Sequence, residues 1–367
     1  MKTLLKYEFY KLWKRRFVPL SLLLMLILIV LHSQYDNTSE YRKFSLQAEH
    51  LILPLNGTID DQFPKKIDTL QTSTKSKDSP LEDFQIERIF NEPRQAFIYY
   101  QTDMQQHTKI ATMPDSILKD RLLQVSQMEN IQYRAQGSTW ANTIYYMDLY
   151  SYYCIFLGII ITVSTVFSHD REVRVEELQS TCKEGRRMGI KAKLLCSYLT
   201  AALLWLMFLA IPLFFTLYYQ GEEGLKATLS LYYPYNNSGY SLSSLTMLCW
   251  LFILSLLGIL VFTTLVLIVT RTIPSMLKAG MLALALFALP LVVNGLPVLT
   301  YFASLMPSYT SRLINAVHKA DGIQIGPLAL LDYELIALWN IFLLCILVVL
   351  LYSSIHGIRR KGGHLHV

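Results

Sequence analysis

The residues best suited to chemistry lie in one polar run between two apolar segments, FSHDREVRVEELQSTCKEGRRMGIKAK, from Phe167 to Lys193. Acids gather near its start and bases near its end, an order that suits the dipole of a short helix. The acids are Asp170, Glu172, Glu176 and Glu177, and the later bases are Lys183, Arg186, Arg187, Lys191 and Lys193. We interpret the run as a cytoplasmic docking element. By the charge pattern alone, a solvated loop that only joins two spans is the more usual interpretation.

Other chemical signals are weak. The chain has no phosphate-binding G-x-x-x-x-G-K-[ST] loop and no nucleophile elbow of the G-x-S-x-G type. His356, His364 and His366 could hold a metal ion, but histidines at a chain end are usually solvated. We therefore expect a protein without catalytic activity, cofactor or metal of its own. If ATP drives it, a separate polypeptide binds the nucleotide.

The composition indicates a membrane protein. Of 367 residues, 53% are hydrophobic and only 16% are charged, whereas soluble domains carry about 25% charged residues. The net charge of +6 is too small and too dispersed to indicate a nucleic-acid partner. It is better explained by bases that hold loops on the cytoplasmic side.

Apolar runs predict an all-helical protein with six membrane spans. The spans are residues 17–31, 151–167, 194–219, 245–270, 279–293 and 335–354. The distribution of Lys and Arg predicts that both termini and the loop 168–193 are cytoplasmic. The interrupted apolar segment 294–331 predicts a re-entrant helical hairpin, because irregular backbone at membrane depth must be covered by protein or face water.

Residues 1–16 predict an amphipathic helix in the headgroup layer of the membrane. Leu5, Phe9 and Leu12 recur at helical spacing, Trp13 adds an aromatic anchor, and five bases surround this stripe. A plain basic flank of the first span is the alternative. The first span lacks the small residues of a signal-peptidase site, so we expect it to be uncleaved.

Residues 32–150 predict a mainly helical extracytoplasmic domain. Ser79 to Glu82 fits a capping box with proline at the first helical position, and residues 113–136 carry apolar side chains at helical spacing. Helix breaks are expected at Pro54, Pro64, Pro80, Pro93 and Pro114. None of the five cysteines lies in this stretch, so it must fold without disulfides.

The six predicted spans contain no Asp, Glu, Lys or Arg. Ion-coupled carriers need ionisable groups at membrane depth, although backbone carbonyls alone can bind sodium. We therefore expect the driving energy to enter from outside the membrane. Irregular backbone for a gate or path is expected at Pro212, Pro290, Asn294 and Pro297.

The polar run resembles the coupling element of permease subunits of type-2 ATP-binding-cassette exporters. The matching residues are Phe167, Asp170, Glu172, Leu178, Ser180, Thr181, Arg186, Arg187, Ile190 and Lys193. Arg174 and Val175 stand where the family usually has Gly-Thr, and Cys182 where it often has Pro. The amphipathic amino-terminal helix, the six spans and the interrupted segment before the last span are similar to those of the family. The large domain after the first span resembles one branch of it.

The resemblance implies a half-transporter. A second permease, identical or related, would pack against this chain, and two ATPase subunits would dock on the loop 168–193. The contact residues would be Asp170, Glu172, Glu176, Glu177, Leu178, Arg186 and Arg187. The cargo would be an amphipathic or apolar peptide, antibiotic or lipid, exported across a bacterial plasma membrane. The alternatives are a sensor or immunity protein whose outer domain captures an extracellular peptide, and a membrane scaffold for secretion.

Overall fold

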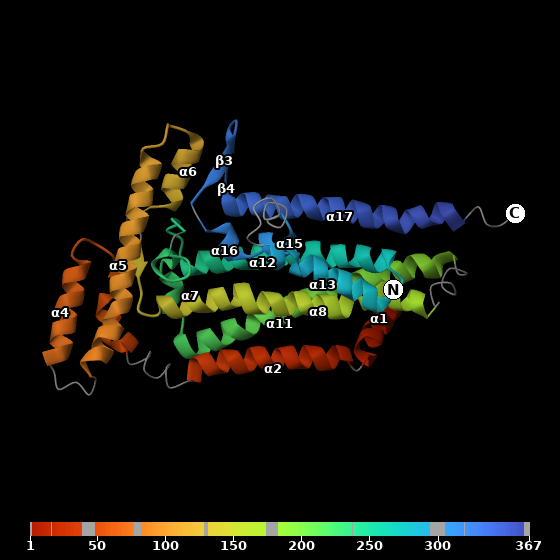
Figure 1. Ribbon diagram of the computed structural model, residues 1–367, viewed down its shortest axis with the longest axis horizontal. Coiled ribbons are helices and arrows are strands. Elements are labelled where there is room, and N and C mark those ends of the chain that lie inside the picture. The colour runs from red at the N-terminus through yellow and green to blue at the C-terminus, as the bar shows by residue number, and fades with distance from the viewer. Residues whose placement is uncertain are drawn as a thin grey trace.

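The computed structural model is mostly helical, as predicted. It describes residues 2–15, 17–38, 48–76, 82–127, 131–173, 183–236, 238–293, 305–318 and 320–362. Figure 1 shows a bundle of long helices lying side by side, with a smaller domain at one end. Helix α1 (Lys2–Lys14) and the carboxyl end of α17 (Asp332–Gly362) both lie at the opposite end of the bundle.

Four helices in the described part of the chain are long and apolar enough to cross a bilayer. They cover Gly137–Glu172, Arg187–Gln220, Ser244–Thr272 and Asp332–Ile355. A fifth span is formed if α1 and α2 (Phe17–Thr38), which meet at a bend of 72°, count as one. Helix α13 (Met276–Val293) is apolar but shorter. The chain is therefore a helical membrane protein with four or five spans by length and composition.

The first of these four helices is assembled from several pieces. It runs through α7 (Gly137–Tyr146), a π-helical turn (η3, Met147–Ser151), α8 (Tyr152–Val163) and α9 (Thr165–Glu172). It begins well before the predicted start at Ser151, and α2 likewise continues past Leu31 to Thr38. Both helices thus project beyond the apolar runs that predicted them.

Helix α12 (Ser244–Thr272) forms the centre of the bundle. It packs against α8, α9, α11 (Lys183–Gln220), α13 and α17. Since neighbours surround it, its apolar residues occupy all faces rather than one stripe. The outer helices instead leave large apolar side chains exposed, as lipid-facing helices do; examples are Leu24 on α2, Leu203 on α11 and Phe342 on α17.

The helices of the domain beside the bundle include α4 (Phe63–Ser76), α5 (Asp83–Ala111) and α6 (Ile117–Val125). A 3₁₀ turn (η1, Leu53–Leu55) precedes them, and strand β1 (Gly57–Thr58) pairs with β2 (Gln132–Tyr133). The predicted break at Pro93 is wrong, because α5 continues through this buried proline. The predicted helix start at Pro80 lies outside the described residues, and α5 begins at Asp83. The capping residue is Glu82, whose amide donates to Gln85 Oε1 at 3.0 Å.

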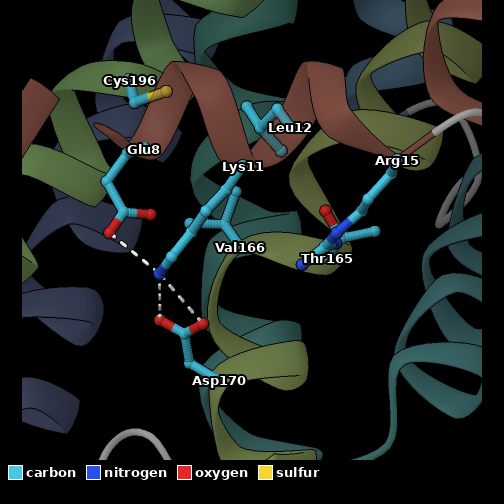
Figure 2. Close-up of a pocket in the computed structure, with 8 residues that line it drawn as sticks. All are labelled: Glu8, Lys11, Leu12, Arg15, Thr165, Val166, Asp170 and Cys196. Atoms are coloured by element: carbon cyan, nitrogen blue, oxygen red, sulfur yellow. Dashed lines mark hydrogen bonds and ion pairs between the residues drawn. The ribbon is translucent and has the colours of Figure 1, made fainter. Parts of the chain in front are cut away.

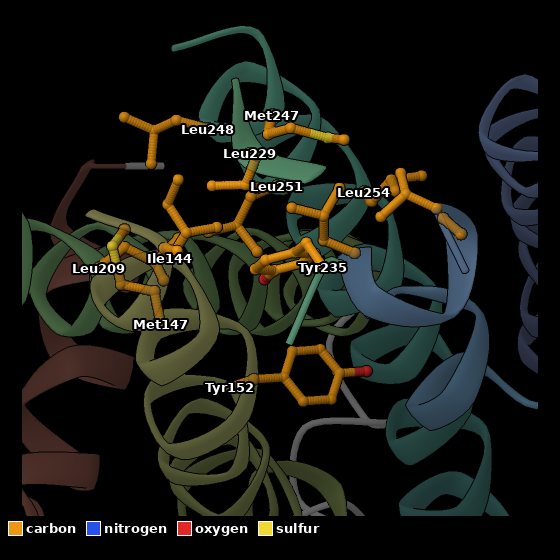
Figure 3. Close-up of a cluster of buried hydrophobic side chains, with 14 of the residues drawn as sticks. Ile144, Met147, Tyr152, Leu209, Leu229, Tyr235, Met247, Leu248, Leu251 and Leu254 are labelled. Carbon is orange, nitrogen blue, oxygen red and sulfur yellow. The ribbon is translucent and has the colours of Figure 1, made fainter. Parts of the chain in front are cut away.

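Two other segments complete this domain. The loop after α11 holds the 3₁₀ turns η4 (Glu223–Lys226) and η5 (Leu229–Leu231), and η5 packs on α5. The Gln132 amide donates to Thr228 Oγ1 at 2.9 Å, and the Tyr232 hydroxyl donates to the carbonyl of Arg134 at 2.7 Å. Figure 3 shows Leu229 and Tyr235 of this loop beside side chains of the bundle such as Ile144 and Leu251. The domain therefore rests on the spans through a shared apolar core.

The segment predicted as a re-entrant helical hairpin, residues 294–331, is different in its described part. Two single-turn helices, α15 (Pro307–Thr310) and α16 (Leu313–Ala316), precede an antiparallel hairpin of β3 (Gly322–Ile325) and β4 (Leu328–Leu331). Gly326, with φ of 59°, and Pro327 form the two-residue turn. Here the glycine at positive φ permits a tight hairpin where apolar composition alone predicted helix.

Candidate functional site at the junction of the amphipathic helix and the spans

The inward face of α1 combines apolar and charged side chains. Leu12 is buried, and Leu5 and Phe9 pack partly buried against the core. Trp13 does not belong to this inward face, and its side chain is 57% exposed. Glu8 lies in the same inward face and is only 7% exposed. The helix thus presents an acid and a base, Glu8 and Lys11, to the ends of the spans.

Asp170 is the centre of this junction. Its carboxylate pairs with Lys193 Nζ at 2.5 Å and with Lys11 Nζ at 3.1 Å. Lys11 also pairs with Glu8 at 3.2 Å, as Figure 2 shows. The Asp170 and Lys193 side chains are each 4% exposed. Buried charges of this kind are stable only when paired, so three separate elements, α1, α9 and α11, are held together at one carboxylate.

Phe167 extends the junction to a fourth element. Lys193 Nζ lies 5.3 Å from the centre of its ring, and the Arg271 guanidinium carbon lies 5.7 Å from it. Arg271 is in the last turn of α12, where a cation also interacts favourably with the helix dipole. The ring therefore lies within cation–π distance of two buried bases from different spans.

A small cavity lies beside the pair of Lys11 and Asp170. Its walls are Glu8, Lys11, Leu12, Arg15, Thr165, Val166, Asp170 and Cys196. It has room for about one water molecule, so it is no substrate site. The junction is therefore an electrostatic joint between α1, α9 and α11.

The structure distributes the predicted coupling residues unequally. Asp170 is buried in the joint, while Glu172 and Arg187 are exposed on the helices that flank it. Arg186 belongs to α11, and nothing is described of its side chain. Glu176, Glu177 and Leu178 lie outside the described residues. Asp170 therefore contacts α1 and α11 through its ion pairs with Lys11 and Lys193.

A second buried carboxylate lies toward the other end of the same long helix. Asp148, in the π-helical turn, is fully buried and accepts hydrogen bonds from the amides of Leu313 at 2.6 Å and Ile314 at 3.2 Å. Arg312 Nε lies 3.6 Å from the same carboxylate. This pair attaches the helix to α16, the single turn that precedes the β-hairpin.

The two carboxylates bracket an uncharged stretch of helix. Asp148 and Asp170 are separated by about 33 Å of helix at about 1.5 Å per residue. No Asp, Glu, Lys or Arg lies between them. The hydrocarbon core of a bilayer is about 30 Å thick. The uncharged stretch thus matches this thickness, and ion pairs at its two ends would avoid the full cost of burial in lipid.

The domain beside the bundle contains a third buried carboxylate, Asp103 on α5. It is 3% exposed, and both of its oxygens lack a hydrogen-bond partner among the described residues at ordinary distance. Burial raises the pKa of this carboxyl to about 7, and the nearby Ser230 hydroxyl of η5 opposes the shift. The Asp103 carboxyl therefore lies at the contact between α5 and η5.

The predicted gate residues are only partly described. Pro212 is buried within α11, and Pro290 is buried within α13, which continues to Val293. Helices α11 and α13 each pack against α8 and α12. Asn294 and Pro297 lie outside the described residues. His364 and His366 also lie outside them, and the described part of the chain holds no group of three or more metal-ligating side chains.

The sequence alone did not single out Lys11 or Asp148. Lys11 was one of several bases around the amphipathic stripe, and a helical wheel places it beside Glu8 but cannot show what faces them. Asp148 lies just outside the predicted span, within a tyrosine cluster. A lone acid so close to a span is the one signal that could have drawn attention to it.

Comparison with protein-family models, with curated proteins and with solved structures gives no match. The function of the chain therefore has to be inferred from its own residues.

Proposed function

We propose that this chain is the membrane permease subunit of an ATP-driven exporter of the type-2 ATP-binding-cassette class. A separate ATPase would dock at the loop 168–193, and two copies would serve a pair of permeases. The cargo would be an amphipathic or apolar peptide, antibiotic or lipid. The single observation that carries the proposal is the joint at Asp170, which ties α1, α9 and α11 together where the polar run leaves the bundle.

This joint suits the transmission of force. The polar run departs from α9 and returns through α11, and its two ends are held by the pair of Asp170 and Lys193. A force applied to the polar run would move α9 and α11 together. The hydrogen bond that Lys11 donates to Asp170 would make α1 move with them. Packed helices move as rigid bodies and transmit such displacement along their length.

A six-span arrangement supports the same proposal. The spans would be α2, the composite helix from α7 to α9, α11, α12, α13 and α17. Helix α1 and the carboxyl end of α17 lie at the same end of the bundle (Figure 1), as an even number of crossings requires. That end would be cytoplasmic, in a bacterial plasma membrane, since Lys and Arg concentrate there. An uncharged interior suits an apolar cargo better than a small ion.

Co-purification tests the docking. The full chain would be expressed with an ATPase encoded beside its gene, and we expect the two to purify together from detergent extract. Glu176→Lys with Glu177→Lys should weaken that association at least about tenfold, because like charges meet at the interface. The matched control is Glu222→Lys with Glu223→Lys, which makes the same charge change at the other end of the bundle.

Two results would contradict the proposal. One is equal ATPase recovery with both double variants, and the other is the absence of any ATPase association with the wild-type chain. If the chain instead binds an extracellular peptide, and inactivating the ATPase leaves cellular peptide levels unchanged, then a sensor or immunity protein is the better description.

A further inference from the structure

The hairpin of β3 and β4 has two very different faces. Direct cross-strand neighbours share a face, and the register pairs Ile323 with Leu330 and Ile325 with Leu328. These four residues therefore form one wholly apolar face. The opposite face contains Ala329 and Leu331, which are 3% and 0% exposed. It packs on α6, where the Leu118 amide donates to Gln324 Oε1 at 3.3 Å.

Three of the four residues on this apolar face are exposed, and Leu330 is half-buried. Ile323, Ile325 and Leu328 are 54%, 65% and 54% exposed. A hairpin beside water normally alternates apolar and polar positions, with the polar ones outward. Here residues 322–331 contain no charged side chain at all. An apolar patch of this kind marks a surface that binds a partner or a membrane.

The position of the hairpin indicates which partner it meets. Strand β4 runs directly into α17 at Asp332, and both strands contact that helix. The exposed apolar side of α17 begins with Leu338, Ile341 and Phe342, which are 47%, 44% and 55% exposed. Leu338 lies about 9 Å along the helix from Asp332. The distance from the base of the hairpin to the lipid-facing surface is thus close to the thickness of the headgroup layer, which is roughly 5–8 Å on each side.

The orientation agrees with this position. In Figure 1, α6 lies on one side of the hairpin, and α17 runs away from its base on the other side. The face opposite α6 therefore faces the side toward which α17 extends. Aromatic side chains also gather at this level, since the rings of Trp250 and Tyr333 lie 4.5 Å apart at the start of α17. Trp and Tyr are typical of the membrane interface.

We propose that the β3–β4 hairpin is a lipid-binding paddle. Its Ile323, Ile325, Leu328 and Leu330 side chains lie in the interfacial layer of the leaflet next to the domain beside the bundle. The occupant is phospholipid, because the apolar face continues the lipid-facing surface of α17 and has none of the charged residues that usually surround a protein-binding surface. This contact anchors α6, and with it the domain beside the bundle, relative to the membrane surface. The inference depends on membrane insertion and not on the ATPase partner.

Fluorescence in nanodiscs that hold one chain each tests the paddle. All five cysteines are replaced by alanine, and an environment-sensitive nitrobenzoxadiazole dye is attached at Ile325→Cys. The matched control is Gln324→Cys, the adjacent residue on the other face of the same strand. The discs contain phosphatidylcholine with or without a nitroxide quencher near the headgroup end of its acyl chain. We expect quenching about twofold stronger at position 325 than at 324, with emission shifted to shorter wavelength.

Equal quenching at the two positions, or none at either, would overturn the proposal. So would a disulfide between Ile325→Cys residues of two chains in larger discs, if the single-chain discs show no quenching at position 325. The occupant would then be a second copy of the chain rather than lipid.

Discussion

Asp170 and Lys193 form an ion pair of 2.5 Å between α9 and α11, and both side chains are 4% exposed. They come from the two ends of the polar run between the second and third predicted spans. The pair therefore holds the two ends of the polar run together at the bundle. Lys11 of α1 bonds to the same carboxylate, so the amphipathic helix is attached where the run departs.

Removing the charge of Asp170 should destabilise the bundle. In Asp170→Asn, the buried Lys193 ammonium loses its anion, a change that costs about 3 kcal/mol in comparable buried pairs. We expect a lower apparent melting temperature of the full chain in detergent. Glu172→Gln, on the same helix but exposed, is the control and should melt like the wild type. Similar melting of all three proteins would show that the pair contributes no stability.

Lys11→Met should loosen α1 while leaving the spans folded. The variant loses the hydrogen bonds to Asp170 and Glu8, about 1.5 kcal/mol in net terms, which raises the opening equilibrium of α1 about tenfold. Hydrogen exchange of residues 2–14, measured by mass spectrometry, should accelerate accordingly. Lys6→Met removes an exposed base from the same helix and serves as the control. Unchanged exchange in Lys11→Met would mean that apolar packing alone holds α1.

Gly258→Ala should disturb the crossing of α12 and the turn after α15. A methyl group at this position would clash with the Ser311 side chain, so the two segments would have to separate. Overpacking of this kind costs about 1–3 kcal/mol. Gly280→Ala is the matched control, since its nearest neighbour would be Ser164 Oγ at 3.7 Å. Melting of the two variants in detergent distinguishes them, and equal melting temperatures would contradict the close contact.

Asp103 should make the stability of the domain beside the bundle depend on pH. Because burial raises the pKa of its carboxyl to about 7, the folded chain keeps this proton at a pH where the unfolded chain has lost it. The contribution of Asp103 to stability is therefore largest below about pH 4, falls between about pH 4 and 7, and is constant above that range. Asp103→Asn should abolish this part of the pH dependence.

The measurement is hydrogen exchange in α5 of the full chain at pH 5 and pH 8, corrected for intrinsic rates. Wild-type protection should fall at the higher pH, and that of Asp103→Asn should not. Asp115→Asn is the control, because Lys119 lowers the pKa of this exposed carboxyl. A pH dependence that survives in Asp103→Asn would assign the effect to another group.

The helical class and the apolar segments could be predicted from the sequence, because burial in lipid demands long uncharged helices whatever they pack against. The amphipathic stripe of α1 was predicted for a similar reason, since Leu5, Phe9 and Leu12 lie on one helical face. These properties depend on neighbours a few residues apart. Local periodicity therefore suffices to predict them.

Tertiary structure decided how the charged residues are used. The sequence predicted Asp170 as one of several docking acids. The fold instead buries it between Lys11, which is far from it in the sequence, and Lys193, which lies at the other end of the polar run. The sequence predicted a helix at residues 322–331. In the structure Gly326 has a positive φ that permits a tight turn, and α6 covers one face of the resulting hairpin. Such outcomes depend on which distant elements meet, and a pattern along one chain does not specify those meetings.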